Sequence, residues 1–436
     1  MPALQRVRAE MSNFLDSQAQ QLTQHANPQL QTWRENALAQ AMRVGFPHNK
    51  LERWKYAPLR ALASKSYAAE NSASEAIDAN QLPPTPRIVF VNGRLNAVHT
   101  DTSALQGVQV RSLADILQSN DERSYSFLGR KFPDLDAPFA SLNTALAEHG
   151  VLIAVAEHNT VETALHIVFI SNNQTPSGQY LRHLIECREY SQFQIIEHHY
   201  SLGENIGMGN QLMHIHLKPH AQLTHVRIQR CAHQAIQFSR NDVILAGHTS
   251  YKRLDIETGA HFSRHELNID LQGEHAQASA GGVLWGTGNS TLDTRLVVRH
   301  QAPNTECQLV WRGLADDKAR VNFYGGITIE KGADGANAAL SNKNLLLSKQ
   351  AQINTQPALE IYADEVKAAH GATVGQLDSA ALFYLRSRGV PKEQAEKLLS
   401  QAFYAEALES IRDDSLVLQL LPYLPQILQR EQEDFV

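Results

Sequence analysis

The sequence predicts a mainly β protein, in which a β-solenoid core is flanked by helical regions at both ends. Between residues 150 and 375, short runs of strand-forming residues alternate with turn clusters at a spacing of roughly 15 residues. Outside this stretch, the apolar residues near both ends of the chain recur at helical spacing instead. Strand-only units that recur along a chain are typical of stacked repeats, because each unit buries its apolar face against the next.

The N-terminal region, residues 1–85, is predicted to be a helical domain. Leu30, Trp33 and Leu38 recur at loosely helical spacing, and the residues between them are mostly polar. A stretch rich in alanine, serine and asparagine at residues 68–80 is followed by two consecutive prolines. Such a composition is typical of a linker.

Residues 86–375 are predicted to form the β-strand region that contains the solenoid. Asn92-Gly93 separates two apolar runs, which is a strong signal for a β-hairpin turn. A β-sandwich is the competing architecture, because its turn signals recur about every 8–12 residues. We prefer the solenoid, since the clusters that follow one another outnumber those that one sandwich comfortably holds.

Residues 376–436 are predicted to form a C-terminal helical domain. A short helix from Ser379 to Arg388 is followed by Gly389, and Pro391 then begins a second helix. The apolar stripe of that helix and the leucines near the end of the chain exceed what a small helical module can hide. They either pack against the end of the solenoid or form a docking surface. The stripe consists of Ala395, Leu398, Leu399, Ala402, Ala405, Leu408 and Ile411.

Composition excludes several classes of protein. A net charge of −6 argues against nucleic acid as the main partner, because phosphate binding needs a basic face. No stretch approaches the roughly 18 apolar residues of a membrane helix, and the N-terminus has no apolar signal core. The three cysteines, Cys187, Cys231 and Cys307, are far apart, which fits buried thiols in a reducing cytoplasm.

Common catalytic motifs are missing from the sequence. There is no phosphate-binding GxxxxGK[ST] loop, no dinucleotide fingerprint, no GxSxG and no HExxH. A solenoid could also belong to a carbohydrate-active enzyme, which needs paired carboxylates, but Asp316-Asp317 and Asp413-Asp414 resemble turn or surface residues. His214 and His216 share one face of a strand, which is typical of a solvated face.

One histidine differs from the other 19 in its setting. His370 lies in the last strand-like segment, directly before Gly371 and Ala372, so that no bulky neighbour crowds its imidazole. A single ligand cannot hold a metal cluster. If His370 binds metal, the remaining ligands must therefore come from another chain. The alternative is that His370 only completes a turn.

Five segments together resemble one known family. They are Trp54–Tyr56, Phe90–Arg94, Ser341–Ser348, Pro357–Gly375 and Phe383–Gly389. In these segments the chain is similar to the SufB/SufD family, the scaffold components of the SUF iron–sulfur cluster assembly system. The resemblance is closest to the SufD branch, which lacks most of the cluster-ligating cysteines. It extends over essentially the whole chain and is densest from Ser341 to Glu406.

The resemblance implies a right-handed parallel β-helix core and a non-catalytic scaffold function in the cytoplasm. It implies a SufB-like partner bound through the β-helix and a SufC-like ABC ATPase docked on the C-terminal helices, while this chain itself binds no nucleotide. His370 would lie at the SufB interface and help to hold a transient iron–sulfur cluster shared with that partner. Some relatives carry a cysteine where this chain has Ala368. The residues that we expect to contact the ATPase are Leu398, Leu399, Phe403 and Leu408.

Two other interpretations stay open. The chain could be a purely structural binding scaffold, and it could form a homodimer when isolated. Co-purification with an ATPase subunit and a SufB-like partner would separate these interpretations from a role in cluster assembly.

Overall fold

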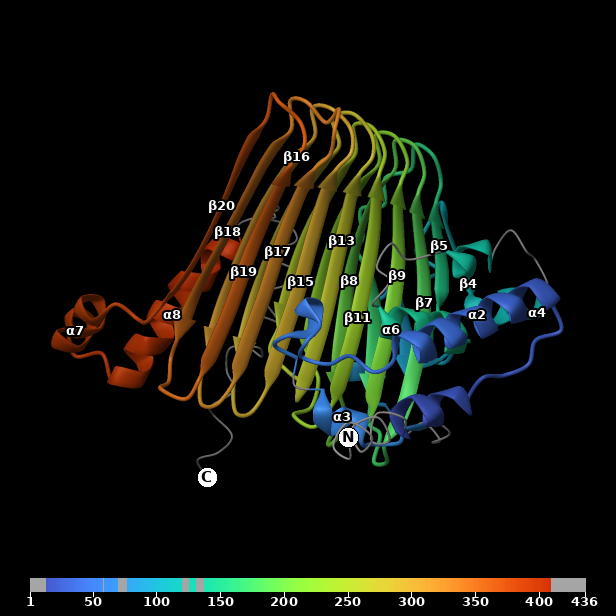
Figure 1. The fold of residues 1–436 in the computed structure, drawn as a ribbon, viewed down its shortest axis with the longest axis horizontal. Helices are drawn as coiled ribbons and strands as arrows, with labels where there is room; N and C mark the ends of the chain where they lie inside the picture. Colours follow the sequence, from blue (N-terminus) through green and yellow to red (C-terminus); the bar gives the residue numbers. More distant parts are fainter. Residues whose placement is uncertain (1–12, 58, 70–76, 120–124, 131–136, 409–436) are drawn as a thin grey trace.

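The computed structural model describes residues 13–57, 59–69, 77–119, 125–130 and 137–408. Its core is a parallel β-helix built from two long sheets that face each other (Figure 1). From residue 177 onward the strands alternate between the two sheets, so each coil adds one strand to each sheet. The predicted solenoid is therefore confirmed, and the competing β-sandwich is wrong.

All the strand pairs along this coil are parallel and in register. The first sheet has the order β19 (Gln352–Ile361), β17 (Arg320–Ile329), β15 (Thr291–His300), β13 (Phe262–Leu271), β11 (Ile236–Leu245), β9 (Met208–Leu217), β7 (Ser177–Cys187), β5 (Val151–Val155) and β4 (Val108–Ser112), with β1 (Ala68–Ala69) on β7. The second has the order β20 (Lys367–Gly375), β18 (Asn337–Leu346), β16 (Glu306–Ala315), β14 (Gln277–Gly286), β12 (Ser250–Glu257), β10 (Gln222–Arg230), β8 (Gln192–Ser201), β6 (Leu165–Ser171), β2 (Arg87–Val91) and β3 (Arg94–Leu95).

The predicted hairpin at Asn92-Gly93 is confirmed. Strands β2 and β3 pair antiparallel on either side of it. Asn92 has a φ of 47° and Gly93 a φ of 78°, so both turn residues adopt the left-handed conformation that a two-residue hairpin turn requires. The hairpin caps the N-terminal end of the second sheet.

N-terminal helices cover the outer face of the first sheet (Figure 1). Aromatic side chains fill this contact, and the rings of Phe139 and Phe238 stack at 3.6 Å between centroids. Besides a helical segment at residues 13–19, the helices are α2 (Pro28–Val44), η1 (Glu52–Trp54), α3 (Arg60–Ala63), η2 (Ala79–Gln81), α4 (Leu113–Ser119), η3 (Ser126–Gly129) and α6 (Pro138–Leu146). The last three lie within the region predicted as strands.

This covering layer corrects the interpretation of His214 and His216. The predicted solvated face is wrong, because His214 is only 2% exposed and its ring contacts that of Phe127. Alternation along β9 places both histidines on the outer face, but residues 125–130 and 137–147 cover that face. The sequence alternation correctly identified the face and could not reveal the layer above it.

The C-terminal helices are α7 (Ser379–Ser387) and α8 (Lys392–Leu408). Asp378 caps α7 by accepting hydrogen bonds from two backbone amides, and Gly389 follows it with a φ of 87°, as predicted. Helix α8 packs on the outer face of β14 and β16, where the ring of Tyr404 contacts that of Trp285. Ile411 and the leucines beyond it lie outside the described residues.

The predicted apolar stripe of α8 is only partly right. Its buried residues are Ala395, Ser400, Tyr404 and Ala407, whereas Leu398 is 43% exposed. The buried face is therefore rotated from the predicted one. Polar and small side chains can lie against the sheet, which an analysis of apolar periodicity does not anticipate.

Several histidines form a ladder along one corner of the β-helix. His158, Tyr190, His220, His248 and His275 all have positive φ values, and each ring stacks on the next at 4.4–4.9 Å between centroids. The same left-handed turn position recurs in successive coils, so the planar side chains at that position lie above one another and stack. These residues therefore have a structural function.

The interior of the β-helix is divided between apolar and charged layers. One continuous apolar cluster runs along it, from Ile88 to Ala351. Beside this cluster, Arg227 and Glu257 form a buried ion pair, and Glu197 contacts both His199 and His225. Buried charges are tolerated only when they are paired, so this network depends on every member.

Buried histidines should make the fold sensitive to mild acid. Burial lowers the pKa of His183, His199 and His300 from 6.5 to about 4, because each ring loses its hydration. Above pH 6.5 these rings are neutral in both the folded and the unfolded chain. Between pH 6.5 and 4 only the unfolded chain binds their protons, so each histidine should cost about 1.4 kcal/mol of stability per pH unit.

These three rings alone should lower the free energy of unfolding by about 4 kcal/mol between pH 7.5 and 5.5, and His166, His216 and His265, whose pKa values burial also lowers, should add to this loss. Urea denaturation followed by circular dichroism at both pH values measures this difference. An unchanged midpoint at pH 5.5 would contradict the buried, neutral state of these rings. The exposed His275→Ala variant serves as a control and should show the same pH dependence as the unaltered protein.

Candidate functional site

His370 lies on β20, the last strand of the second sheet. Strand β20 pairs on one side with β18, where His370 is opposite Leu340. On its other side no described strand continues the sheet. The imidazole is exposed and makes no hydrogen bond to a described residue, so both ring nitrogens are available.

The register of the strands shows that this exposed residue continues a column of interior residues. In-register pairing places His370 at the end of a column that faces the interior of the β-helix. The preceding members of that column are all buried, namely Leu165, Ile195, His225, Arg253, Ala280, Leu309 and Leu340. His370 is thus an interior position that is exposed because no further coil of the described residues covers it.

The open end of the β-helix is apolar as well as unpaired. Strands β19 and β20 are both terminal in their sheets, and an unpaired edge is a ready template for another strand. Five of the ten large exposed apolar side chains of the described residues are concentrated here. They are Ile361, Tyr362, Val374, Phe383 and Tyr384, with exposures from 43% to 73%. This end has the composition of an interface.

The interior becomes polar beside the column of His370, two and four residues further along β18. The Asn342 side chain on β18 accepts a hydrogen bond from the Thr355 hydroxyl at 2.7 Å, which connects the two sheets. The Asn344 amide donates to Asn342 at 2.6 Å and to the Thr373 carbonyl at 3.0 Å. This network fixes the last two strands of the second sheet to each other, and it therefore holds the backbone around His370.

This chain does not supply a complete metal site at His370. Within the described ranges, no three histidine, cysteine, aspartate or glutamate side chains converge in a way that could hold a metal ion. Ala368, two residues earlier, has no ligating atom. A metal bound at His370 would therefore need ligands from a second molecule, as the sequence predicts.

The three cysteines are remote from such chemistry. Cys187, Cys231 and Cys307 are at most 4% exposed, and burial raises the pKa of each thiol to about 12. The thiols are therefore protonated at neutral pH and are poor nucleophiles. The prediction that they are buried is confirmed.

The four residues expected to contact an ATPase occupy different environments. Leu398 is exposed and Leu399 is half-buried. Phe403 and Leu408 instead pack against the cluster that contains Val283 and Leu314 on the chain's own sheet. Docking by these residues stays a prediction, and Leu398 is the most accessible of the four.

Sequence reasoning missed the apolar residues beside His370. Ile361 ends β19 and corresponds to the apolar residues that end earlier strands of the first sheet, such as Leu271 and Ile329, and Tyr362 follows it directly. The sequence carries no signal for this exposure, because it arises where the described coils end and leave these residues uncovered.

Of the acidic pairs, Asp317 lies in an exposed turn as predicted, and Asp413-Asp414 fall outside the described residues. No described helix is long and apolar enough to span a bilayer.

Comparisons with known proteins cover nearly the whole chain. A family model described as SUF system FeS cluster assembly, SufBD core domain, matches residues 169–403, and the SufBD protein N-terminal region matches residues 6–167. The chain is 30% identical to the iron–sulfur cluster assembly protein SufD of Escherichia coli, over 90% of this chain and 91% of that protein. It is 28% identical to a SufBD family protein of Synechocystis, over 84% of each chain.

Proposed function

Because this chain belongs to the SufBD family of iron–sulfur cluster assembly proteins, we propose that it is a non-catalytic scaffold subunit that offers His370 to a nascent cluster. The observation that carries the proposal is the position of His370 at the uncovered end of an interior column. The cluster is the cargo of this scaffold. It would be shared with a sister subunit that supplies the remaining ligands.

The chemistry of the imidazole supports this function. Imidazole is a suitable ligand for iron, and histidine replaces cysteine on one iron of some natural clusters. Both nitrogens of His370 are accessible, and the network of Asn342 and Asn344 holds the strand that carries it. With Ala368 two residues away, thiolate ligands would have to come from the partner.

The open end supports a partner that has a similar β-helix. A SufB-like subunit could pair its own edge with β19 or β20 and cover Ile361, Tyr362 and Val374. Pairing would enclose His370 between the two chains and would exclude water from the cluster. A second copy of this chain fits the same edge, so a homodimer in the absence of the partner is the second candidate assembly.

Co-expression tests the proposed assembly. We expect this chain to co-purify with a SufB-like subunit and an ABC-type ATPase, and with the SufB-like subunit in preference to itself. Tyr362→Glu should weaken the pairing with the SufB-like subunit at least tenfold, because it places a charge in the contact. The matched control is Val98→Glu, which places the same charge at an exposed apolar residue that is not part of the open end. Equal pairing by both variants would contradict an interface at the open end.

Truncation tests the docking of the ATPase. Deletion of the residues after Gly389 should abolish co-purification with the ATPase while the circular dichroism of the β-helix is retained. Because α8 also packs on the chain's own sheet, a point variant is needed to separate docking from packing. Leu398→Glu should reduce ATPase binding at least tenfold, whereas Gln394→Glu, which adds the same charge at an exposed polar position, should not. Undiminished binding by both the truncated chain and Leu398→Glu would refute this docking site.

A further inference from the structure

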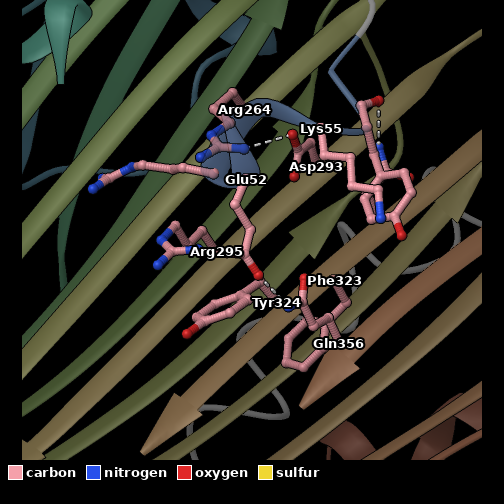
Figure 2. Close-up of a pocket in the computed structure, with 11 residues that line it drawn as sticks. Glu52, Lys55, Arg264, Asp293, Arg295, Phe323, Tyr324 and Gln356 are labelled. Carbon is pink, nitrogen blue, oxygen red and sulfur yellow. Dashed lines mark hydrogen bonds and ion pairs between the residues drawn. The ribbon is translucent and has the colours of Figure 1, made fainter. Parts of the chain in front are cut away.

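Residues 46–57 and 59–63 cross the outer face of the first sheet and enclose two adjoining pockets against it. Lys55 and Tyr56 line both of them. Figure 2 shows the first pocket, which is lined by Glu52, Lys55, Arg264, Asp293 and Gln356, among others. The second pocket opens toward the beginnings of β17 and β19 and has a volume of about 710 Å³.

In the first pocket, most positive charges are matched by carboxylates. Arg264 donates to Asp293 at 2.7 Å and also pairs with Glu266 at 3.0 Å (Figure 2). Arg53 forms a further ion pair with Glu266 at 2.5 Å. Arg295 lies over the ring of Tyr324, 3.7 Å from its centroid. This pocket is satisfied internally and is too small for an organic ligand.

In the second pocket the positive charges are unmatched. Lys55, Arg60 and Arg320 converge on it from three separate places in the sequence, and His48 lies at its rim. No carboxylate occurs among the described residues that line it, and none of these three cations forms an ion pair within the described part of the chain. Their side chains are exposed and can reorient toward a bound anion.

The rest of the lining is suited to the body of an organic ligand. Phe46 and Leu59, at most 4% exposed, form an apolar floor. Tyr56 is 40% exposed, and the Lys55 ammonium lies 5.2 Å from the centroid of its ring, so a planar ligand would stack on the opposite face or displace that ammonium. Asn49 and Gln352 offer amide groups that make no hydrogen bond to a described side chain. Ligand sites in proteins typically combine such a floor with a few convergent polar groups in a volume of about 300–1,000 Å³.

We propose, against the expectation from the family resemblance that this chain binds no nucleotide, that this second pocket binds a small organic phosphate with a planar, partly apolar body, of about the size of a mononucleotide. Arg60 and Arg320 would hold the phosphate, because guanidinium groups bind phosphate oxygens bidentately. Tyr56 would stack on the planar ring, and the floor of Phe46 and Leu59 would exclude water beneath it. The contrast with the adjoining pocket supports this assignment, because there the protein's own carboxylates neutralise the arginines.

Isothermal titration calorimetry of the full chain with AMP tests the proposal. AMP should bind at least tenfold more tightly than adenosine, which lacks the phosphate, and than inorganic phosphate, which lacks the ring. An Arg60→Ala/Arg320→Ala variant should lose at least tenfold in affinity for AMP. The matched control, Lys331→Ala, removes an exposed cation from a turn outside the pocket and should bind like the unaltered chain.

Three outcomes would overturn the proposal. The first is the absence of AMP binding at millimolar concentration. The second is equal affinity for AMP in the double-arginine variant and in Lys331→Ala, which would indicate a nonspecific effect of charge. The third is binding of a poly-glutamate peptide without binding of AMP, which would assign the pocket to an acidic protein segment instead. Both arginine side chains are exposed, and circular dichroism should show that the double variant keeps its fold.

Discussion

Replacement of His370 by alanine is expected to reduce the cluster content of the anaerobically reconstituted complex at least tenfold without affecting the fold. The imidazole is exposed and makes no hydrogen bond to a described residue, so its removal should change the free energy of unfolding by less than about 0.5 kcal/mol. Iron and sulfide analysis together with visible absorption measures the cluster. Urea denaturation of the free chain measures stability.

Two further variants make this result specific. His275→Ala removes an exposed histidine of the corner ladder and should leave the cluster content unchanged. His370→Cys keeps a ligating atom at the same position, so it should retain more cluster than His370→Ala. Normal cluster formation by His370→Ala in complex with its partners would refute a ligand function for this residue.

Replacement of Glu257 by glutamine is expected to destabilise the β-helix by about 3–5 kcal/mol. Glu257 is fully buried, pairs with Arg227, and accepts a hydrogen bond from Ser263 at 2.8 Å. Glutamine preserves the shape but removes the charge, which leaves the Arg227 cation buried without its counterion. Urea denaturation of the free chain at pH 7.5 measures the loss.

Matched variants show whether the loss arises from the buried charge. The double variant Arg227→Met/Glu257→Leu removes both charges and should recover most of the stability that Glu257→Gln loses. Glu396→Gln breaks the exposed pair with Lys392 and should cost less than about 0.5 kcal/mol. A loss below 1 kcal/mol for Glu257→Gln would mean that this network is not buried as described.

The core of the fold could be predicted because its signals are local and repeated. A hairpin at Asn92-Gly93 and a helix end at Gly389 each require a left-handed backbone, and only a few residue types adopt it readily. Turn clusters in every coil likewise indicated the solenoid. Turn residues that recur along the chain therefore predict its secondary structure even when their tertiary contacts are unknown.

Features that depend on contacts between distant segments could not be predicted. Alternation placed His214 and His216 on one face, but only the packing of residues 125–130 and 137–147 on β9 shows that His214 is buried and His216 half-buried. Similarly, Phe403 and Leu408 lie on an apolar helix in the sequence, and only the structure shows that they pack on β14 and β16. In each case the apolar or polar pattern is the same for a free surface and for a covered one.

The candidate site could be predicted from the sequence only in part. The small residues after His370 indicated an accessible imidazole, and the structure places that residue on an exposed strand. Its membership of an interior column follows only from the register of β18 and β20, which no local pattern determines. The exposed Tyr362 and Val374 became part of the site for the same reason.

The central claim is that the His370 imidazole ligates a cluster shared with a partner subunit, and pulsed electron paramagnetic resonance tests it most directly. The complex would be assembled with 15N-labelled histidine in this chain alone and reduced anaerobically. A ligating imidazole should give a hyperfine coupling from 15N that His370→Ala abolishes. A reduced cluster that shows no 15N coupling in the unaltered complex would contradict the claim.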